Sequence, residues 1–230
     1  MPAAARIDLK TPAPRALFAV SAIIVLIGTV YPFLITGFFH DDSINSALAG
    51  HLNRNSMGLF AYCLKLATHW METASRFYPL SFFLGYPAAY FFQEAWQSRA
   101  FQILMVTVDF GLLASLLRSS GRSSREIFLA VAIVLACFQI RPYYDPVTGF
   151  SGLLQINLAF GLLAIRFAQA YLLNDTKPLA AALSVISFAL GLIHYELALS
   201  FLPILIFQAW KARKWKWLAS FLGTTFAYLL

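Results

Sequence analysis

The stretch 178-PLAAALSVISFALGLIHYELALSFLPILIFQAW-210 decides the fold of this chain. It runs for 33 residues, and charged or histidine side chains interrupt it only at His194-Tyr195-Glu196. One α-helix of that length would measure about 50 Å, whereas the hydrocarbon core of a bilayer is about 30 Å thick. We therefore predict a hairpin of two short helices, 178–193 and 197–210, with His194-Tyr195-Glu196 at the turn.

The polar turn of this hairpin is itself a candidate site. A glutamate between two apolar helices is costly unless it meets water or a partner. Glu196 and its neighbour His194 are therefore candidates for substrate binding. The alternative is a simple helix-hairpin turn.

The composition of the whole chain agrees with the hairpin. The 230 residues are 60% hydrophobic and 12% charged, whereas an ordinary soluble domain is about 25% charged. Because such a chain cannot bury its apolar surface in one water-soluble core, we predict an all-α fold, a polytopic transmembrane helical bundle. The net charge of +7 lies in short clusters between apolar runs. This pattern is typical of cytoplasmic loops, and no nucleic-acid partner is expected.

The other apolar runs extend the bundle to both sides of the hairpin. Residues 1–16 are predicted to form a cytoplasmic tail, and 17–230 a membrane domain with one large external loop, 39–99. The final run has only 14 residues, too few to span a bilayer, so we expect the chain to be truncated relative to its relatives. The predicted spans lie near 17–38, 100–117, 126–140, 150–172, 178–193, 197–210 and, in part, 217–230.

The aromatic segment 77–97 determines the orientation. If it does not span and the N-terminal tail is inside, 11 Lys and Arg residues lie inside and 5 outside; if it spans, the two numbers are exchanged. Cytoplasmic loops carry the excess of Lys and Arg, and aromatic, proline-broken segments are typical of the membrane interface. We therefore predict an interfacial or re-entrant helix on the outer face. Two amphipathic helices, 43–55 and 59–71, are predicted to lie along the same surface.

This orientation places the acidic residues that follow apolar runs on one face. Asp41, Asp42, Asp145 and Glu196 all point to the outer side, so they are able to share a site. Asp42 is suited to cap the helix 43–55. The functional alternative for Asp41 or Asp42 is a general base or a ligand of a divalent cation, and the two interpretations are compatible because one Asp can cap while the other faces a cavity.

Two outer segments add basic and aromatic side chains. Arg76 and Tyr78 lie at the start of the aromatic segment, and an Arg there is able to bind phosphate through two parallel hydrogen bonds. An interfacial anchor is the more ordinary role of an isolated Arg. The loop 141–149 presents Arg141, Tyr144 and Asp145 between two prolines. It is either a stiff turn with an internal Arg–Asp pair or a substrate-binding loop, and its density of polar groups favours the second.

Two charges lie inside predicted spans, Asp109 and Arg166. Charges within a membrane are usually paired, so we predict a structural pair, with a transport pathway as the alternative. The histidines lack a zinc-ligand spacing, and no nucleophile elbow, phosphate-binding glycine loop or dinucleotide fingerprint is present.

The order of these features resembles the membrane glycosyltransferases of the GT-C fold. The features are a short tail, an anchor helix, an outward acidic pair, surface helices and the segment Arg76-Phe77-Tyr78-Pro79-Leu80. The resemblance covers most of residues 15–210. Two departures are Ser75, where the family pattern has Gly, and a chain end that precedes the further helices and soluble C-terminal domain common in such enzymes.

The resemblance implies transfer of a sugar from a polyprenyl-phosphate carrier to an acceptor on the outer face of the cytoplasmic membrane. Asp41 or Asp42 would be the general base or a metal-associated carboxylate, and the need for a divalent cation stays open. Attack opposite the leaving phosphate would invert the anomeric centre. The implied partners are the lipid-linked sugar and membrane lipid. By the same resemblance, Arg76 and Arg141 would bind the lipid phosphate, and Glu196 would supply a second acidic contact.

Two other functions remain open. A transporter or flippase-like protein would depend on Asp109 and Arg166 more than on the outer acidic residues. A non-catalytic membrane subunit would depend on neither set. The sugar, the acceptor and the oligomeric state are not indicated by the sequence.

Overall fold

The computed structural model describes residues 46–137, 152–173 and 178–230, together with positions 20, 23, 24, 27, 28 and 31. The ordered elements of these ranges are helices, with no strand among them, so the predicted all-α class is confirmed for this part of the chain. The elements are α3 (Leu48–Arg54), α4 (Leu59–Ala74), α5 (Pro79–Phe91), α6 (Ala95–Ser119), α7 (Ser124–Cys137), α8 (Leu153–Leu173), α9 (Pro178–His194), the 3₁₀ helix η1 (Glu196–Phe201), α10 (Leu202–Lys211) and α11 (Trp215–Leu229).

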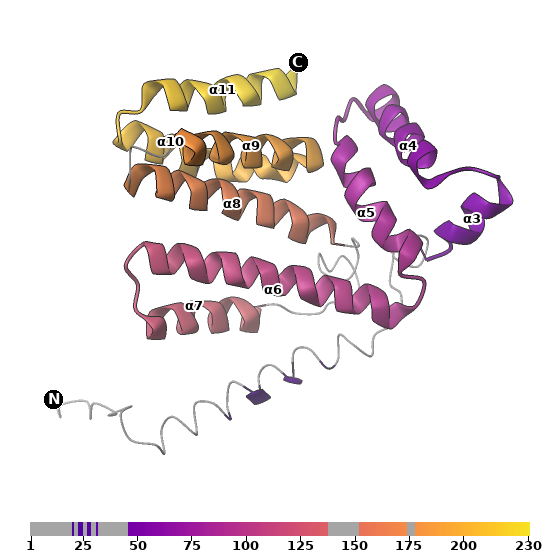
Figure 1. The fold of residues 1–230 in the computed structure, drawn as a ribbon, viewed down its shortest axis with the longest axis horizontal. Helices are drawn as coiled ribbons and strands as arrows, with labels where there is room; N and C mark the ends of the chain where they lie inside the picture. The colour runs from indigo at the N-terminus through magenta and orange to yellow at the C-terminus, as the bar shows by residue number, and fades with distance from the viewer. Residues whose placement is uncertain are drawn as a thin grey trace.

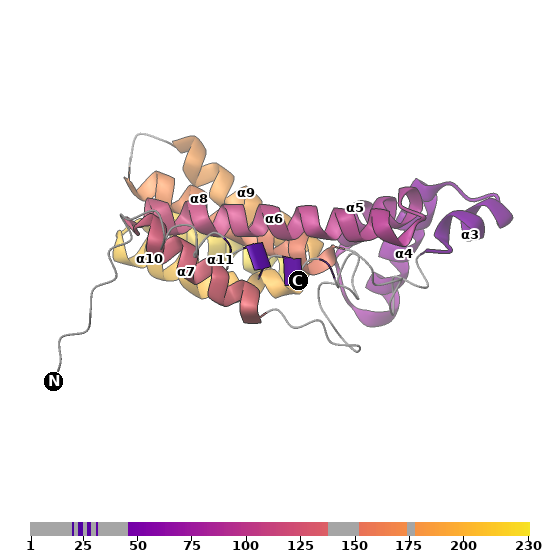
Figure 2. The same ribbon diagram turned by 90° about the horizontal axis from the view of Figure 1, so that it is seen from below.

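The helices form two groups. Helices α6 to α11 lie side by side with their axes roughly parallel, and α3, α4 and α5 lie beyond one end of this bundle (Figure 1). The view from below shows the same division along the long axis of the molecule (Figure 2). We call the end of the bundle next to α3–α5 the loop end, and the opposite end the basic end.

The predicted hairpin is present. Helix α9 ends at His194, and the chain turns back at Tyr195 into η1 and α10. The second arm differs from the prediction, because Glu196–Phe201 forms a 3₁₀ helix before α10 begins at Leu202. A 3₁₀ helix rises about 2.0 Å per residue and an α-helix 1.5 Å. The second arm is therefore longer than an α-helix of the same number of residues.

The main core lies between α8, α9, α10 and α11. Ala164 and Ala168 of α8 are completely buried, and their small side chains allow α9 to approach closely. The Ser184 hydroxyl of α9 donates to the Ala164 carbonyl oxygen at 2.7 Å. Phe188 of α9 and Phe221 of α11 contact each other edge to face, with ring centroids 5.7 Å apart. Apolar packing and buried hydrogen bonds thus hold the central helices together.

Helices α3, α4 and α5 follow the predicted order, with boundaries that differ from the predicted ones. The helix predicted over 43–55 is described only from Leu48 to Arg54, whereas that over 59–71 continues to Ala74. The aromatic segment 77–97 divides in two, because α5 ends at Phe91 and Ala95 already belongs to α6. A capping box explains the new start, since Glu94 caps the first turn of α6 while its N–H donates to Gln97 Oε1 at 3.2 Å.

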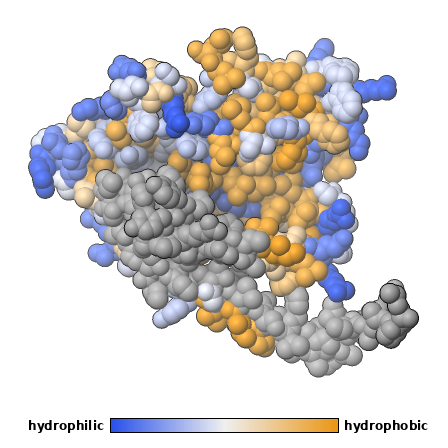
Figure 3. All heavy atoms as spheres, turned by 180° about the vertical axis from the view of Figure 1, so that it is seen from behind, coloured by the Kyte–Doolittle hydropathy of each residue, from blue (hydrophilic) through white to orange (hydrophobic). Residues whose placement is uncertain are grey.

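Two helices of the bundle, α6 and α8, are long and apolar enough to cross a membrane, and α9 is an apolar helix of shorter length. They correspond to the predicted spans 100–117, 150–172 and 178–193. Helix α7 begins two residues before the predicted span 126–140 and is described to Cys137. The predicted tail 1–16 lies outside the described residues, as does nearly all of the span 17–38. A space-filling view shows a broad apolar face over the bundle, with hydrophilic side chains toward both ends (Figure 3).

The α8–η1 contact gives a test of this packing. A Cβ added to Gly161 would overlap the ring of Phe201, so Gly161→Ala must displace that ring. We expect it to lower the free energy of unfolding by about 1–3 kcal/mol, the usual cost of overpacking. A lower Tm in detergent would be the measured effect.

The matched control for this substitution is Gly111→Ala in α6, where an added Cβ meets nothing within 4 Å. Replacing a helical Gly by Ala at an open position is stabilising by about 0.5–1 kcal/mol. A Gly161→Ala protein as stable as the Gly111→Ala protein would contradict the packing of η1 on α8.

Candidate functional site at the loop end

Two of the predicted substrate-binding residues meet at the loop end, although 120 positions separate them in the sequence. Arg76 Nη1 lies 3.5 Å from Glu196 Oε1, and the two side chains are 49% and 36% exposed. Arg76 lies in the link between α4 and α5, and Glu196 begins η1 after the hairpin turn. The prediction that the aromatic segment and the hairpin turn share one face is in line with this contact.

Tyrosine rings surround this ion pair. Tyr78 forms a side-chain hydrogen bond with Arg76, and its ring meets that of Tyr195 edge to face with centroids 5.8 Å apart. The carboxylate of Glu196, followed by the hydrogen bond to Tyr78, raises the pKa of Arg76. Burial raises the pKa of Tyr78, and the hydrogen bond to Arg76 opposes this shift. At neutral pH Arg76 is therefore a cation and Tyr78 a neutral phenol.

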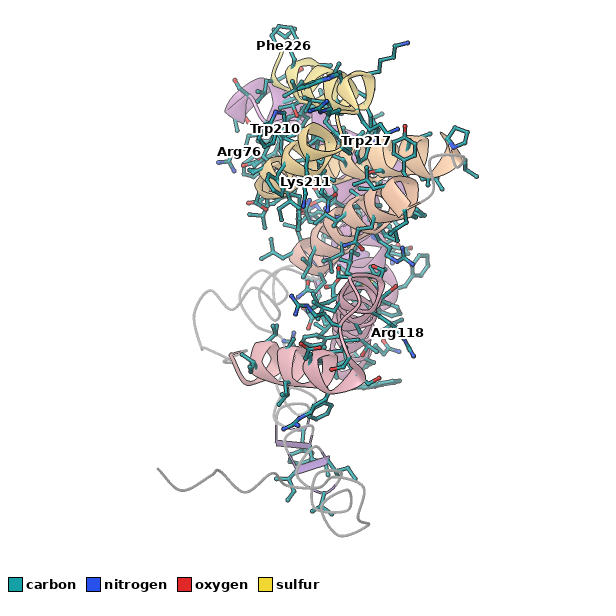
Figure 4. All side chains as sticks on the ribbon, turned by 90° about the vertical axis from the view of Figure 1, so that its left-hand side faces the viewer. Arg76, Arg118, Trp210, Lys211, Trp217 and Phe226 are labelled. Atoms are coloured by element: carbon teal, nitrogen blue, oxygen red, sulfur yellow. The ribbon has the colours of Figure 1, made fainter. Side chains whose placement is uncertain are left out.

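The last helix contributes a further tyrosine. Tyr228 of α11 interacts electrostatically with Glu196, Tyr78 and Arg76. We call the group formed by Arg76, Tyr78, Tyr195, Glu196 and Tyr228 the Arg–Glu–Tyr cluster. Its members come from the α4–α5 link, the hairpin turn and the end of α11, so three separate parts of the chain form it. Figure 4 labels Arg76 among the side chains of the molecule, seen from the basic end.

The backbone before Arg76 explains its position. Ser75 ends α4 with φ 51° and ψ 35°, in the left-handed region, which favours glycine. The turn carries the chain from the end of α4 into Tyr78, which precedes α5.

Asn157 of α8 fixes the hairpin turn from inside the bundle. Its Nδ2 donates to the carbonyl oxygens of Gly191 and Tyr195, both at 2.9 Å. Asn157 is completely buried. Both amide hydrogens are used, so one side chain connects the last turn of α9 to the residue that precedes Glu196. Asn157 therefore positions the Arg–Glu–Tyr cluster without belonging to it.

His194, predicted to bind substrate, lies inside the bundle. It is completely buried and its ring packs on that of Phe160, with centroids 5.9 Å apart. Neither ring nitrogen has a hydrogen-bond partner in the described part of the protein. Because the turn places residue 194 on the inner side and residue 196 on the outer side, His194 supports the turn while Glu196 reaches the surface.

The predicted pair of Asp109 and Arg166 is not formed. Arg166 Nε donates to Ser115 Oγ at 3.1 Å, and Oδ1 of Asp109 has no partner among the described residues. Positions 109 and 115 lie about 9 Å apart along a helix. The Arg166 guanidinium therefore binds a residue that lies nearly two helical turns from Asp109, its predicted partner.

The remaining predicted site residues are Asp41, Asp42, Arg141, Tyr144 and Asp145. All five lie outside the described residues, so their proximity to the cluster stays a prediction. Within the described ranges no three His, Cys, Asp or Glu side chains are grouped to hold a metal ion. A cation site at Asp41 or Asp42 also stays a prediction.

Two cluster members and one buried cation were not singled out from the sequence. Tyr195 lies in the predicted turn but was not among the predicted site residues, and Tyr228 joins the cluster only through the packing of α11. Arg99 is completely buried near the start of α6, where its Nη1 donates to Gln102 Oε1 at 2.6 Å. The i, i+3 spacing of Arg99 and Gln102 is the one sequence signal that pointed to this contact.

The role of Asn157 can be tested by an isosteric change. Asn157→Asp replaces the amide nitrogen by an oxygen that faces two carbonyl oxygens, so both hydrogen bonds are lost. We expect a loss of about 1–3 kcal/mol in the free energy of unfolding, measured by thermal denaturation in detergent.

The same substitution at Asn55 serves as the control. Asn55 Nδ2 also donates to a backbone carbonyl, that of His51 at 2.8 Å, but it is exposed at the end of α3. Its replacement should change stability by no more than about 0.5 kcal/mol. Equal effects at the two positions would argue against the role of Asn157 in holding the turn.

Comparison with known proteins gave no family. No protein-family model matches the chain, no curated protein matches it, and no solved structure matches it.

Proposed function

We propose that this chain is a polytopic membrane protein whose loop end binds a polyprenyl-phosphate sugar and transfers the sugar to an acceptor on the outer face. The observation that carries the proposal is the Arg76–Glu196 contact within a group of tyrosines, at the opposite end of an apolar bundle from its basic loops. Three further features support it: the apolar surface, the distribution of charge and the chemistry of the cluster.

The dimensions of the bundle suit a bilayer. The second arm of the hairpin has six 3₁₀ residues and ten α-helical residues, which together rise about 27 Å. This is close to the hydrocarbon thickness of about 30 Å. Large apolar side chains are exposed along the bundle, among them Leu104, Ile133 and Phe207. Lipid would cover these side chains, whereas water would leave them unfavourably exposed.

The distribution of charge supports the predicted orientation. The links α6–α7 and α10–α11 lie at the basic end, away from α3–α5 (Figure 1), and Arg118 and Lys211 are labelled at this end in Figure 4. Lys and Arg gather on the cytoplasmic side of membrane proteins. The loop end would then face outward. The exposed basic residues of the described links and helix ends at the basic end are Arg118, Arg122, Arg125, Lys211, Arg213 and Lys216, whereas Arg54, Lys65 and Arg76 are exposed in or beside α3 and α4.

The Arg–Glu–Tyr cluster has the chemistry to bind a lipid phosphate at the membrane surface. A guanidinium has five N–H donors in a plane and binds phosphate through two of them. Glu196 contacts Arg76 at 3.5 Å and both remain partly exposed, so the ion pair is weak and leaves donors available. Tyrosine side chains at headgroup depth are amphipathic and hold this position.

The proposed reaction is an inverting substitution. The acceptor hydroxyl oxygen attacks the anomeric carbon, and the bond from that carbon to the phosphate oxygen breaks. The bonding electron pair leaves with the phosphate, which Arg76 stabilises, and the hydroxyl proton passes to Asp41 or Asp42. The carboxylate of Glu196 orients Arg76. A divalent cation at the acidic pair would neutralise the leaving phosphate further.

The proposal is tested by sugar transfer in membranes that contain the full chain and a panel of radiolabelled polyprenyl-phosphate sugars. At least one of Asp41→Asn and Asp42→Asn should abolish transfer at unchanged expression, because the base is lost. Arg76→Lys should reduce transfer roughly tenfold to hundredfold, since an ammonium cannot make the two parallel hydrogen bonds.

The matched control is the second exposed ion pair of the described residues. Arg122 and Glu126 also lie 3.5 Å apart, at the basic end, so Arg122→Lys should leave transfer unchanged. Full transfer by both Asn variants would sink the assignment of the base. Equal losses in Arg76→Lys and Arg122→Lys would show that the effect of Arg76 is not specific to the site.

A further inference from the structure

A cavity of about 440 Å³ lies between α6, α7, α8 and η1, apart from the Arg–Glu–Tyr cluster. Its volume is within the range of about 300–1,000 Å³ that is common for small-molecule sites. Most of its described lining is apolar, with Phe110, Leu158 and Phe201 among the wall residues. The polar side chains of this lining include Asp109 and Asn157.

Asp109 is the single charged side chain among the described lining residues. It is 94% buried, since 6% of its surface is exposed, and its Oδ1 has no hydrogen-bond partner in the described part of the chain. The expected partner, Arg166, binds Ser115 instead. A buried carboxyl oxygen without a hydrogen-bond donor is unfavourable. A cationic ligand would remove this cost.

Asn157 of α8 lines the same cavity. Its Nδ2 donates to two backbone carbonyls, and this fixes the orientation of the amide. The amide oxygen, Oδ1, is therefore the remaining polar atom, and it too has no partner among the described residues. A ligand that donates hydrogen bonds would satisfy both buried acceptor oxygens.

We propose that this cavity binds an apolar molecule that carries a protonated primary amine. The ammonium group donates to Asp109 and Asn157, and the hydrocarbon body packs against the apolar walls. The carboxyl group of Asp109, without a basic side chain among the described lining residues, disfavours a phosphate in this cavity. The cavity is thus a second site, separate from the proposed binding of the lipid phosphate at the loop end.

The experiment uses the full chain in nanodiscs of zwitterionic lipid, with tritiated 1-adamantylamine as the probe. This molecule is compact, apolar and charged at one primary amine. We expect saturable binding by the wild-type protein and at least tenfold weaker binding by Asp109→Asn. Competition by 1-adamantanol, which has the same hydrocarbon cage without the charge, should be at least tenfold weaker than competition by the unlabelled amine.

Two further variants distinguish binding in this cavity from partitioning of the probe into lipid and from misfolding of the protein. Leu158→Trp fills the cavity and leaves Asp109 intact, so it should also abolish saturable binding. Glu126→Gln, an exposed carboxylate at the start of α7, should bind as the wild-type does. Asp109→Asn removes a buried charge and keeps its shape, so its Tm should be unchanged or higher.

Three results would overturn the proposal. The first is the absence of saturable binding by the wild-type protein. The second is equal binding by the wild-type and Asp109→Asn proteins. The third is equal competition by 1-adamantanol, which would show that the cavity selects an apolar shape without the charge.

Discussion

The two hydrogen bonds from Asn157 to the carbonyls of Gly191 and Tyr195 are the constraint on which the rest of this structure depends. They fix the turn between α9 and η1, and the turn places His194 inside and Glu196 outside. Glu196 then reaches Arg76, and Tyr195 meets Tyr78. The buried amide of Asn157 on α8 thus fixes the turn through which the bundle contacts the α4–α5 link, where the Arg–Glu–Tyr cluster forms.

The hairpin and the helix order could be predicted from the sequence because they follow from length and hydrophobicity alone. The run 178–210 is too long for one crossing, and its polar residues stand at the middle. The meeting of Arg76 with Glu196 was expected only as a shared face, because the direct contact depends on how α4, α5 and α9 pack. The 3₁₀ start of the second arm has no comparable signal, because its residues Glu196–Phe201 also suit an α-helix.

The predicted Asp109–Arg166 pair was wrong for a related reason. The sequence positions of two charged residues on their helices restrict how deep each lies in the membrane. The rotation and axial offset of the two helices decide whether the charges meet. Arg166 donates a hydrogen bond to Ser115, and Asp109 lines the cavity between α6, α7, α8 and η1. Tyr228 joins the cluster through tertiary packing, for which a single aromatic residue near a chain end provides no sequence pattern. The acidic pair Asp41-Asp42 lies outside the described residues, so its predicted role still depends on the orientation of the bundle.

That orientation is the central claim, and cysteine labelling tests it most directly. Glu72→Cys on α4 and Ser123→Cys before α7 each introduce one exposed thiol, at the loop end and the basic end respectively. In a background with Cys63→Ser and Cys137→Ala, a membrane-impermeant maleimide should label position 72 in intact cells. Position 123 should react only after the membrane is permeabilised. Labelling of both positions from outside, or of position 123 alone, would contradict an outward-facing site.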